Sequence, residues 1–201
     1  MSEQHLAVIV LAAGEGTRMR SSTPKVLHEI AGLPMLGHAL ATATALGAQK
    51  VIPVIRHEKD KLEAYINAFY PKAHIVHQDE IPGTGRAVEC ALNAFPDDYS
   101  GAVVVTSGDV PLLDVQTIES MIEVHLSTGA GATLLTATFD NPTGYGRIVR
   151  DDSGSFRSIV EERDATEEER EITEVNAGVY VFDFKLLKSA LAAIGSHNAA
   201  G

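Results

Sequence analysis

Short apolar runs alternate along the chain with longer segments in which apolar residues recur at helical spacing. Runs rich in branched residues predict buried strands, because such side chains pack well on a pleated surface. These runs cover residues 6–13, 50–56, 73–78, 101–109, 131–139 and 174–183. Helical periodicity predicts helices over 35–47, 58–70, 85–95, 115–127 and 184–194, with Asp114 as the N-cap of the fourth.

Strand and helix alternate through most of the chain, which favours an α/β fold with a mostly parallel central sheet covered by helices on both faces. Residues 146–162 predict a hairpin that turns near 152–154 and forms a small inserted lobe. Thr166 and Glu169 fit a capping box and predict a short helical turn over 167–171. We expect residues 1–201 to form a single domain.

The charge balance limits the classes of partner. Lys and Arg number 16 against 27 Asp and Glu, a formal net charge of −11. Nucleic acids and anionic membranes need basic surfaces, so we expect neither as a partner, whereas a small anion needs only a few local cations. The first apolar run follows no basic segment and is too short to span a bilayer, so a cytoplasmic location is expected. The single cysteine, Cys90, lies in an apolar helical pattern and is expected to pack in the core.

The segment LAAGEGTRMRSSTPKVL, residues 11–27, is the first candidate for chemistry. It fits neither the P-loop nor the dinucleotide fingerprint, because Met19 stands where each requires its last glycine. A glycine turn after a strand can still present backbone N–H groups to an anion. Arg18 and Lys25 add two cations that could straddle a polyphosphate; the alternative is a surface loop with incidental basic residues.

Two further segments follow predicted strands, at the edge where ligands bind in open α/β sheets. Asp109 is either a Mg²⁺ ligand, completed by substrate phosphates, or a turn residue that caps its own backbone. The amide of Gln78 matches the mixed edge of uracil, although a flipped amide would serve cytosine. Gly83 and Thr84 either add backbone contacts to a base or simply begin a helix.

The predicted hairpin supplies a third set of polar groups. Gly146 begins it, Glu161 closes it and Asn176 lies on the following strand; a sugar with several hydroxyl groups would suit them. Turn chemistry, a solvated strand end and a strand-edge amide are the alternative explanations. No sequence motif indicates a His/Cys metal site or a covalent nucleophile.

Taken together, LAAGEGTRM, SSTPKVLH, PGTGRAV, SGDVPLL, PTGYGRIVR, IVEERDAT and EVNAGVY resemble sugar-phosphate nucleotidylyltransferases, and more closely the bacterial N-acetylglucosamine-1-phosphate uridylyltransferases. The resemblance runs from Leu6 to the last residues. It implies a Rossmann-like nucleotide-diphospho-sugar transferase fold. It also implies transfer of UMP from UTP to N-acetylglucosamine 1-phosphate, giving UDP-N-acetylglucosamine and pyrophosphate for cell-wall precursors.

The resemblance also assigns roles to residues. Arg18 and Lys25 would bind the triphosphate, and Asp109 would hold Mg²⁺. The remaining substrate contacts would come from Leu11, Ala12, Ala13, Gly14, Gln78, Gly83 and Thr84 on the nucleoside, from Ser107 and Gly108 beside the metal, and from Gly146, Glu161 and Asn176 on the sugar.

One departure from the family is expected to matter. The chain ends before the segment that holds a second Mg²⁺ ligand, an asparagine, and before a left-handed β-helix that acetylates glucosamine 1-phosphate. We therefore expect a truncated N-terminal domain, with any homotrimer belonging to a longer parent. Two alternatives remain open: a nucleotidylyltransferase for another base or sugar, and a fragment that binds a sugar nucleotide with little turnover.

Overall fold

The computed structural model describes residues 5–16, 19 and 21–193. These residues form two compact units. The first comprises the described residues up to 133 together with 180–192, and the second comprises 134–179 and Ala193.

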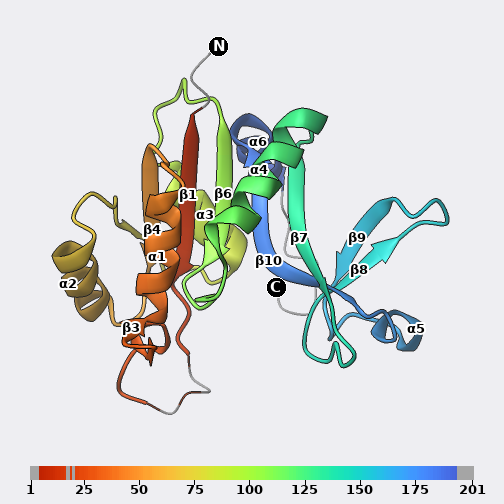
Figure 1. Ribbon diagram of the computed structural model, residues 1–201, viewed down its shortest axis with the longest axis horizontal. Helices are drawn as coiled ribbons and strands as arrows, with labels where there is room; N and C mark the ends of the chain where they lie inside the picture. The colour runs from red at the N-terminus through yellow and green to blue at the C-terminus, as the bar shows by residue number, and fades with distance from the viewer. Residues whose placement is uncertain (1–4, 17–18, 20, 194–201) are drawn as a thin grey trace. The chain divides into compact units, whose positions relative to one another are not determined.

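A largely parallel sheet forms the centre of the first unit (Figure 1). Strand β1 lies between β4 and β6 and runs parallel to both, so that Val8 faces Val51 on one side and Val104 on the other. The next strand beyond β4 is β5, also parallel, whereas the last residues of β10 pair antiparallel with β6. The bounds are β1 Leu6–Ala12, β4 Lys50–Ile55, β5 Val76–His77, β6 Ala102–Ser107 and β10 Glu174–Asp183.

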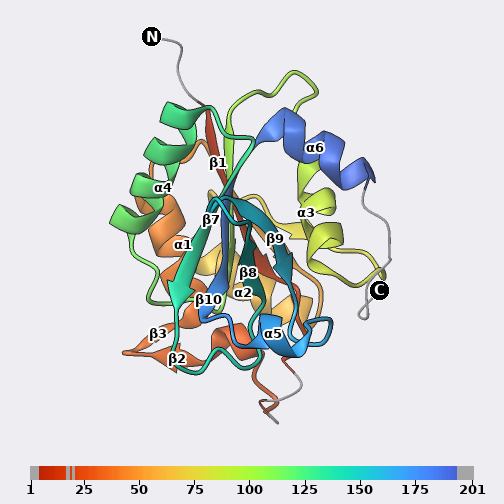
Figure 2. The same ribbon diagram turned by 90° about the vertical axis from the view of Figure 1, so that its right-hand side faces the viewer.

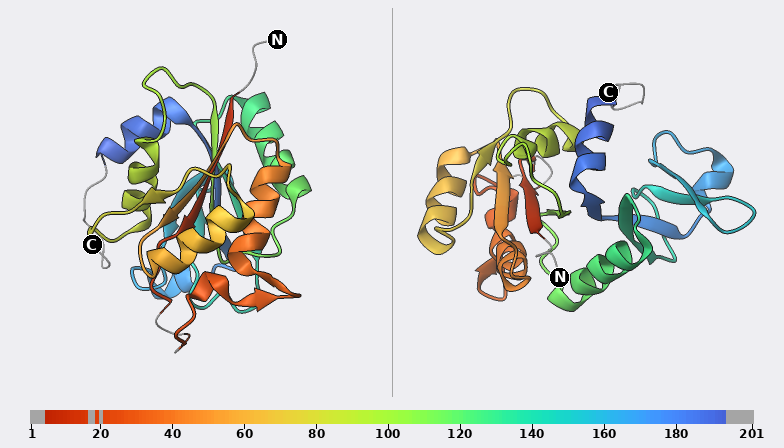
Figure 3. Two further views of the ribbon diagram at one scale, coloured as in Figure 1. Left: turned by 90° about the vertical axis from the view of Figure 1, so that its left-hand side faces the viewer. Right: turned by 90° about the horizontal axis from the view of Figure 1, so that it is seen from above.

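Helices cover both faces of this sheet. Seen along its plane, α1 and α4 lie on one face and α3 and α6 on the other (Figures 2 and 3). Alternate residues of β1 explain the two layers: Ile9 packs in a cluster with Val88 and Phe184, while Val8 faces Ala39 and Ile118. The helices are α1 Met35–Ala45, α2 Lys59–Phe69, α3 Thr84–Leu92, α4 Val115–Thr128 and α6 Phe184–Ala193.

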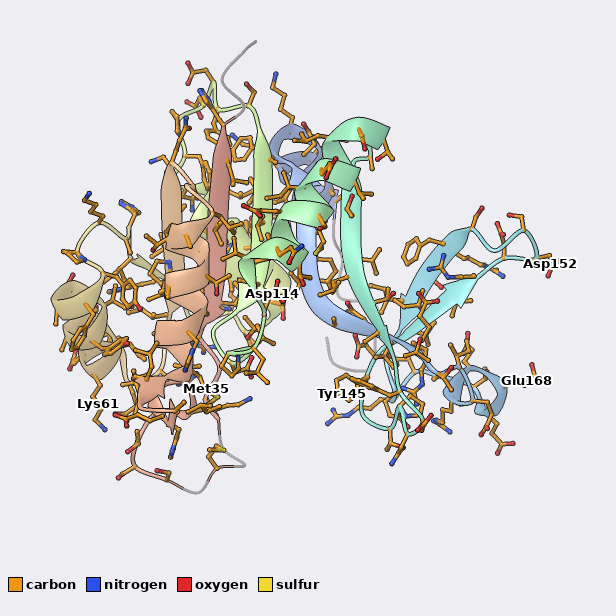
Figure 4. The ribbon with its side chains drawn as sticks, in the orientation of Figure 1. Met35, Lys61, Asp114, Tyr145, Asp152 and Glu168 are labelled. Carbon is orange, nitrogen blue, oxygen red and sulfur yellow. The ribbon has the colours of Figure 1, made fainter. Side chains whose placement is uncertain are left out.

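The second unit is built on an antiparallel hairpin. Strands β8 (Arg147–Arg150) and β9 (Phe156–Val160) pair with each other, and Asp152 marks the tip between them (Figure 4). Strand β8 also pairs with the first half of β10 at Val175, and β7 (Ala132–Thr138) pairs with β10. The short helix α5, Glu167–Arg170, carries the predicted capping box: Thr166 and Glu169 exchange side-chain and backbone hydrogen bonds.

Most predicted elements are confirmed, and the differences have local causes. Two small elements were not predicted, because elements of two or three residues carry no periodicity. They are a hairpin of β2 (Glu29–Ile30) and β3 (Leu33–Pro34) and the 3₁₀ turn Lys25–Leu27. The strand predicted over 73–78 shrinks to β5. Cys90 is buried, as predicted. No helix in the described part of the chain is long and apolar enough to span a bilayer. The single-domain expectation stays a prediction.

Candidate functional site

The carboxyl ends of β1 and β6 bring the glycine loop and Asp109 together. Leu11 lies opposite Ser107 in the sheet, so both strands open into loops at the same level. Between these loops is a cavity of about 420 Å³. It is lined by Leu11, Ala12, Gly14, Gly16, Met19, Lys25, Val26, Ser107 and Asp109. Ligands of open α/β sheets bind at this edge.

Gly16 and Lys25 pack against each other within the loop. Gly16 has a φ of +63°, and a Cβ added to it would lie 2.6 Å from the Cβ of Lys25. Glycine is therefore required twice, for its backbone conformation and for the close approach of Lys25. Arg18, the other predicted triphosphate ligand, lies outside the described residues.

Lys25 and Asp109, 84 positions apart in sequence, form an ion pair in this cavity. The second carboxylate oxygen of Asp109 accepts a hydrogen bond from the hydroxyl of Ser107. Burial by itself would raise the pKa of Asp109, but the hydrogen bonds from Lys25 and Ser107, with the charge of Lys25, outweigh it and hold the pKa below its ordinary value. Asp109 is therefore a carboxylate at neutral pH.

The side chains around the cavity show whether the predicted Mg²⁺ can bind there. In the described part of the chain, no group of three or more His, Cys, Asp or Glu side chains is placed to hold a metal ion. Asp109 offers a single ionised carboxylate that faces the cavity. Mg²⁺ commonly takes only one or two protein carboxylates and completes its shell with water and substrate phosphates. The residues present fit such an ion when a polyphosphate binds beside it.

Gln78 is buried at the end of β5, and its amide is oriented by the chain itself. The amide nitrogen donates to the carbonyl oxygens of Ile81 at 2.8 Å and Gly83 at 3.1 Å. A flipped amide would place its oxygen against both carbonyl oxygens, so the flip that the sequence left open is disfavoured. Thr84 begins α3 directly after Gly83, whose φ of +115° suits glycine.

Several supporting side chains were not identified from sequence. Arg56 follows β4 and donates to the carbonyl oxygen of Glu80 at 2.9 Å, and His57 lies 3.2 Å from the carboxylate of Glu15 in the glycine loop. One signal for them was available: the predicted strand 50–56 ends at this same sheet edge. Their partners are distant in sequence, so the pairing itself was not predictable.

The three residues that were predicted to bind the sugar, Gly146, Glu161 and Asn176, all lie in the second unit. The backbone N–H of Asn176 donates to the carbonyl oxygen of Gly146 at 2.8 Å. A Cβ added to Gly146 would lie 3.0 Å from a carboxylate oxygen of Glu161. A larger residue at position 146 would therefore crowd that carboxylate, whereas glycine does not. The turn just before them is held by Glu162, which accepts from the backbone of Gly144.

Arg147, which is 1% exposed, binds several parts of the second unit together. Its guanidinium pairs with the carboxylate of Glu162 at 2.8 Å and donates to the carbonyl oxygens of Tyr145 and Arg170. These bonds satisfy a buried charge and fix the turn that carries Tyr145, labelled in Figure 4. The turn before Gly146 is therefore fixed by a buried arginine. The amide oxygen of Asn176 accepts a hydrogen bond from the backbone N–H of Gly178 at 3.0 Å.

Each unit thus presents its own polar chemistry. The first holds a cation, an ionised carboxylate and a glycine turn around one cavity, which suits a polyphosphate with a divalent cation. The second gathers a carboxylate and an amide, which suit hydroxyl and amide groups.

Known proteins share sequence similarity with this chain over nearly its whole length. Residues 8–174 match the family described as the MobA-like NTP transferase domain. The chain is 56% identical to the "Bifunctional protein GlmU" of Clavibacter sepedonicus over 96% of its own length and 39% of that protein's. It is 53% identical to the same-named protein of Leifsonia xyli subsp. xyli, over all of the chain and 41% of the relative. The chain thus spans about two fifths of these curated relatives.

Solved structures share the fold at low sequence identity. A UDP-glucose pyrophosphorylase in complex with UDP-glucose superposes with a TM-score of 0.76 at 18% identity, over 97% of this chain and 82% of that one. A 4-diphosphocytidyl-2C-methyl-D-erythritol synthase from Anaerococcus prevotii gives 0.66 at 16% identity, over 98% and 80%. These likenesses show a Rossmann-like α/β fold. Because the family model matches most of the chain, residues 8–174, the chain belongs to the MobA-like NTP transferase domain family.

Proposed function

We propose that this chain transfers UMP from UTP to N-acetylglucosamine 1-phosphate, releasing pyrophosphate and forming UDP-N-acetylglucosamine. The observation that carries the proposal is the placement of Lys25 and Asp109 in one cavity with the glycine turn. The sequence relatives, at about half identity over the whole chain, support the choice of reaction.

The reaction needs no protein nucleophile. A phosphate oxygen of the sugar phosphate attacks the α-phosphorus of UTP, the bond from that phosphorus to the bridging oxygen of the β-phosphate breaks, and pyrophosphate leaves with the bonding electrons. The protein's part is to position both substrates and to neutralise charge. Lys25 binds the triphosphate and stabilises the charge that grows on the departing pyrophosphate, and Arg18 is proposed to share this task.

We propose Mg²⁺ as the cofactor, with Asp109 as its protein ligand. A bound divalent ion supplies charge neutralisation at phosphate oxygens. In the chain alone, Asp109 keeps Lys25 directed into the cavity through their ion pair. The hydroxyl of Ser107 holds the same carboxylate in place and keeps it ionised.

The hydrogen bonds that the Gln78 side chain makes within the chain favour uracil over cytosine. Its amide hydrogens are used by the carbonyl oxygens of Ile81 and Gly83, which leaves its own oxygen to accept a hydrogen bond. The ring N3–H of uracil is a donor, whereas N3 of cytosine is an acceptor and would face that oxygen unfavourably in the same pose. Leu11 to Gly14, Gly83 and Thr84 are proposed to supply the remaining nucleoside contacts, and Gly108 lies beside them.

The sugar is proposed to bind Gly146, Glu161 and Asn176. The Glu161 carboxylate lies against Gly146, and the backbone of Asn176 is bonded to Gly146. A carboxylate and an amide in one unit suit the hydroxyl and acetamido groups of N-acetylglucosamine. A nucleotidylyltransferase for another sugar phosphate is the second candidate, because these groups would also bind other hydroxylated ligands. The cytoplasmic location of the protein stays a prediction. Acetyl transfer and trimer formation are expected only of a longer parent protein.

Product analysis tests the proposal. The purified chain is incubated with Mg²⁺, either UTP or CTP, and either N-acetylglucosamine 1-phosphate or glucose 1-phosphate, and the products are separated by anion-exchange chromatography. We expect UDP-N-acetylglucosamine as the main product. A faster reaction with glucose 1-phosphate would replace the sugar assignment, and no product from any pair would contradict catalysis by this chain.

A further inference from the structure

The segment between Gln78 and α3, residues 79–83, is held in place from two directions within the first unit. It supplies both carbonyl oxygens that orient the Gln78 amide. Arg56 holds it from the end of β4, and Arg86 holds it from the first turn of α3. No residue of this segment belongs to a strand or a helix, so side chains must fix its backbone.

Arg56 acts on the backbone of this segment. Its guanidinium donates to the carbonyl oxygen of Glu80 at 2.9 Å, while the carboxylate of Glu80 lies 3.7 Å away. The side chain of Arg56 is 22% exposed, whereas that of Glu80 is fully exposed. An exposed ion pair contributes little, so the bond to the carbonyl oxygen is the effective contact. Glu80 directly precedes Ile81, the first acceptor of the Gln78 amide.

Arg86 fixes the other end. Its Nε lies 3.0 Å from one carboxylate oxygen of Asp79 and 3.2 Å from the other, and Asp79 also accepts from the backbone N–H of Ile81 at 3.1 Å. Arg86 therefore holds the segment through a side chain, whereas Arg56 holds its backbone. Removing Arg56 takes away the hydrogen bond at the carbonyl oxygen of the Glu80–Ile81 peptide. The bond from the N–H of that peptide to Asp79 remains, so the peptide can tilt about this single remaining bond.

We propose that Arg56 is a positioning residue for base selection. By holding the Glu80 carbonyl oxygen it keeps the Ile81 and Gly83 carbonyl oxygens on the Gln78 amide nitrogen, and so directs the Gln78 oxygen to a base with a ring N–H donor. Without Arg56, the amide turns either way, and a base with a ring acceptor, such as cytosine, binds nearly as well. The inference rests on the proposed nucleotide site and deepens it, because it names what sets the preference.

The test compares UTP and CTP in Arg56→Met, with two readouts. One is kcat/KM for each nucleotide with N-acetylglucosamine 1-phosphate, and the other is the Kd of each nucleotide with Mg²⁺ by calorimetry. We expect the UTP/CTP ratio to fall about tenfold in both, the size expected for one oriented hydrogen bond. The KM for UTP should rise while kcat at saturation stays within about twofold, because Arg56 does not touch the reacting atoms.

Control variants separate this role from general damage. Arg150 is a matched control in the second unit, because it also binds a carbonyl oxygen, that of Gly154, and a glutamate, Glu174. Arg150→Met should leave the UTP/CTP ratio unchanged. Glu80→Gln removes only the exposed carboxylate and should also leave it unchanged, whereas Arg56→Lys should recover part of the preference. If Arg56→Met fails to fold, Arg56→Lys alone must still show a measurable fall in the ratio.

A double variant gives the sharpest result. In a Gln78→Ala background, Arg56→Met should change the UTP/CTP ratio no further, since Arg56 acts through the Gln78 amide. An additive effect, or a wild-type ratio in Arg56→Met, would overturn the inference. Absence of turnover in the wild-type chain would count against the proposed reaction only, because the calorimetric ratio still tests the role of Arg56.

Discussion

Lys25 and Asp109 are the residues that the proposed reaction needs most, and their ion pair holds each of them in place. The ion pair keeps a flexible lysine in the cavity and an ionised carboxylate beside it. In the proposed reaction, Lys25 would exchange the Asp109 oxygen for phosphate oxygens, so its charge would be available without a large rearrangement.

Replacing Lys25 by methionine should slow pyrophosphate release by roughly 10²–10³, the usual loss when one preorganised donor to a transition state is removed. Methionine keeps the side-chain length, so the loop backbone should be preserved. Lys188→Met is the control, because Lys188 forms only an exposed ion pair with Asp97 on the surface. A Lys25→Met rate within threefold of wild type would contradict the assigned role.

Gly16→Ala tests whether the loop's backbone places Lys25. The substitution carries the strain of a left-handed residue, about 1–2 kcal/mol, and also a clash with Lys25. Gly47→Ala is matched in φ, +68°, but its Cβ would have open space. We expect similar losses in urea-derived stability from strain and a loss of activity only in Gly16→Ala. Equal activity in the two variants would show that Lys25 needs no such placement.

Among the elements, α4 shows how local signals and tertiary packing combine. Asp114 caps its N-terminus by accepting from the backbone of Thr117 at 2.7 Å, as predicted from sequence. Near its other end, His125 is buried and lies 3.1 Å from the hydroxyl of Thr133. Sequence gave no sign of that burial, because a histidine at a helix end is commonly solvated.

Burial lowers the pKa of His125, and the nearby charge of Asp183 opposes this only in part. A lowered folded-state pKa means that the unfolded chain takes up the proton first as the pH falls. The free energy of unfolding should therefore decrease as the pH falls below 6.5 and level off below the folded pKa of His125. Urea unfolding between pH 7.5 and 5.5 should show a smaller decrease in His125→Asn than in wild type; parallel curves would contradict this.

Strands were predictable where the apolar run is long, as for β1 and β10, and helices where apolar residues recur at helical spacing over several turns. Elements of two or three residues, such as β2 and β3, are set by the turn at Ala31 and Gly32, both of which have positive φ. The strand predicted after residue 73 is cut short because only Val76 and His77 pair with β4.

On the scale of the whole molecule, candidate residue types were predictable from sequence but their partners were not. The order of strands brings Lys25 to Asp109 and Arg56 to Glu80, pairs separated by 84 and 24 positions. Gly146, Glu161 and Asn176 come together because β8, β9 and β10 are neighbours in one unit. Sequence motifs marked Lys25, Asp109 and the three sugar-binding candidates but not Arg56 or Glu80, and only the topology brings the partners together.

Asp109 is the residue through which the proposed nucleotidyl transfer stands or falls. The most direct measurement is Mg²⁺-dependent pyrophosphate release from UTP and N-acetylglucosamine 1-phosphate by wild type, Asp109→Asn and Asp114→Asn. Asparagine also caps helices well, so the Asp114 variant makes the same chemical change outside the site. We predict a loss of at least about 100-fold for Asp109→Asn and a rate within about twofold of wild type for Asp114→Asn. Equal rates in all three proteins would contradict the account.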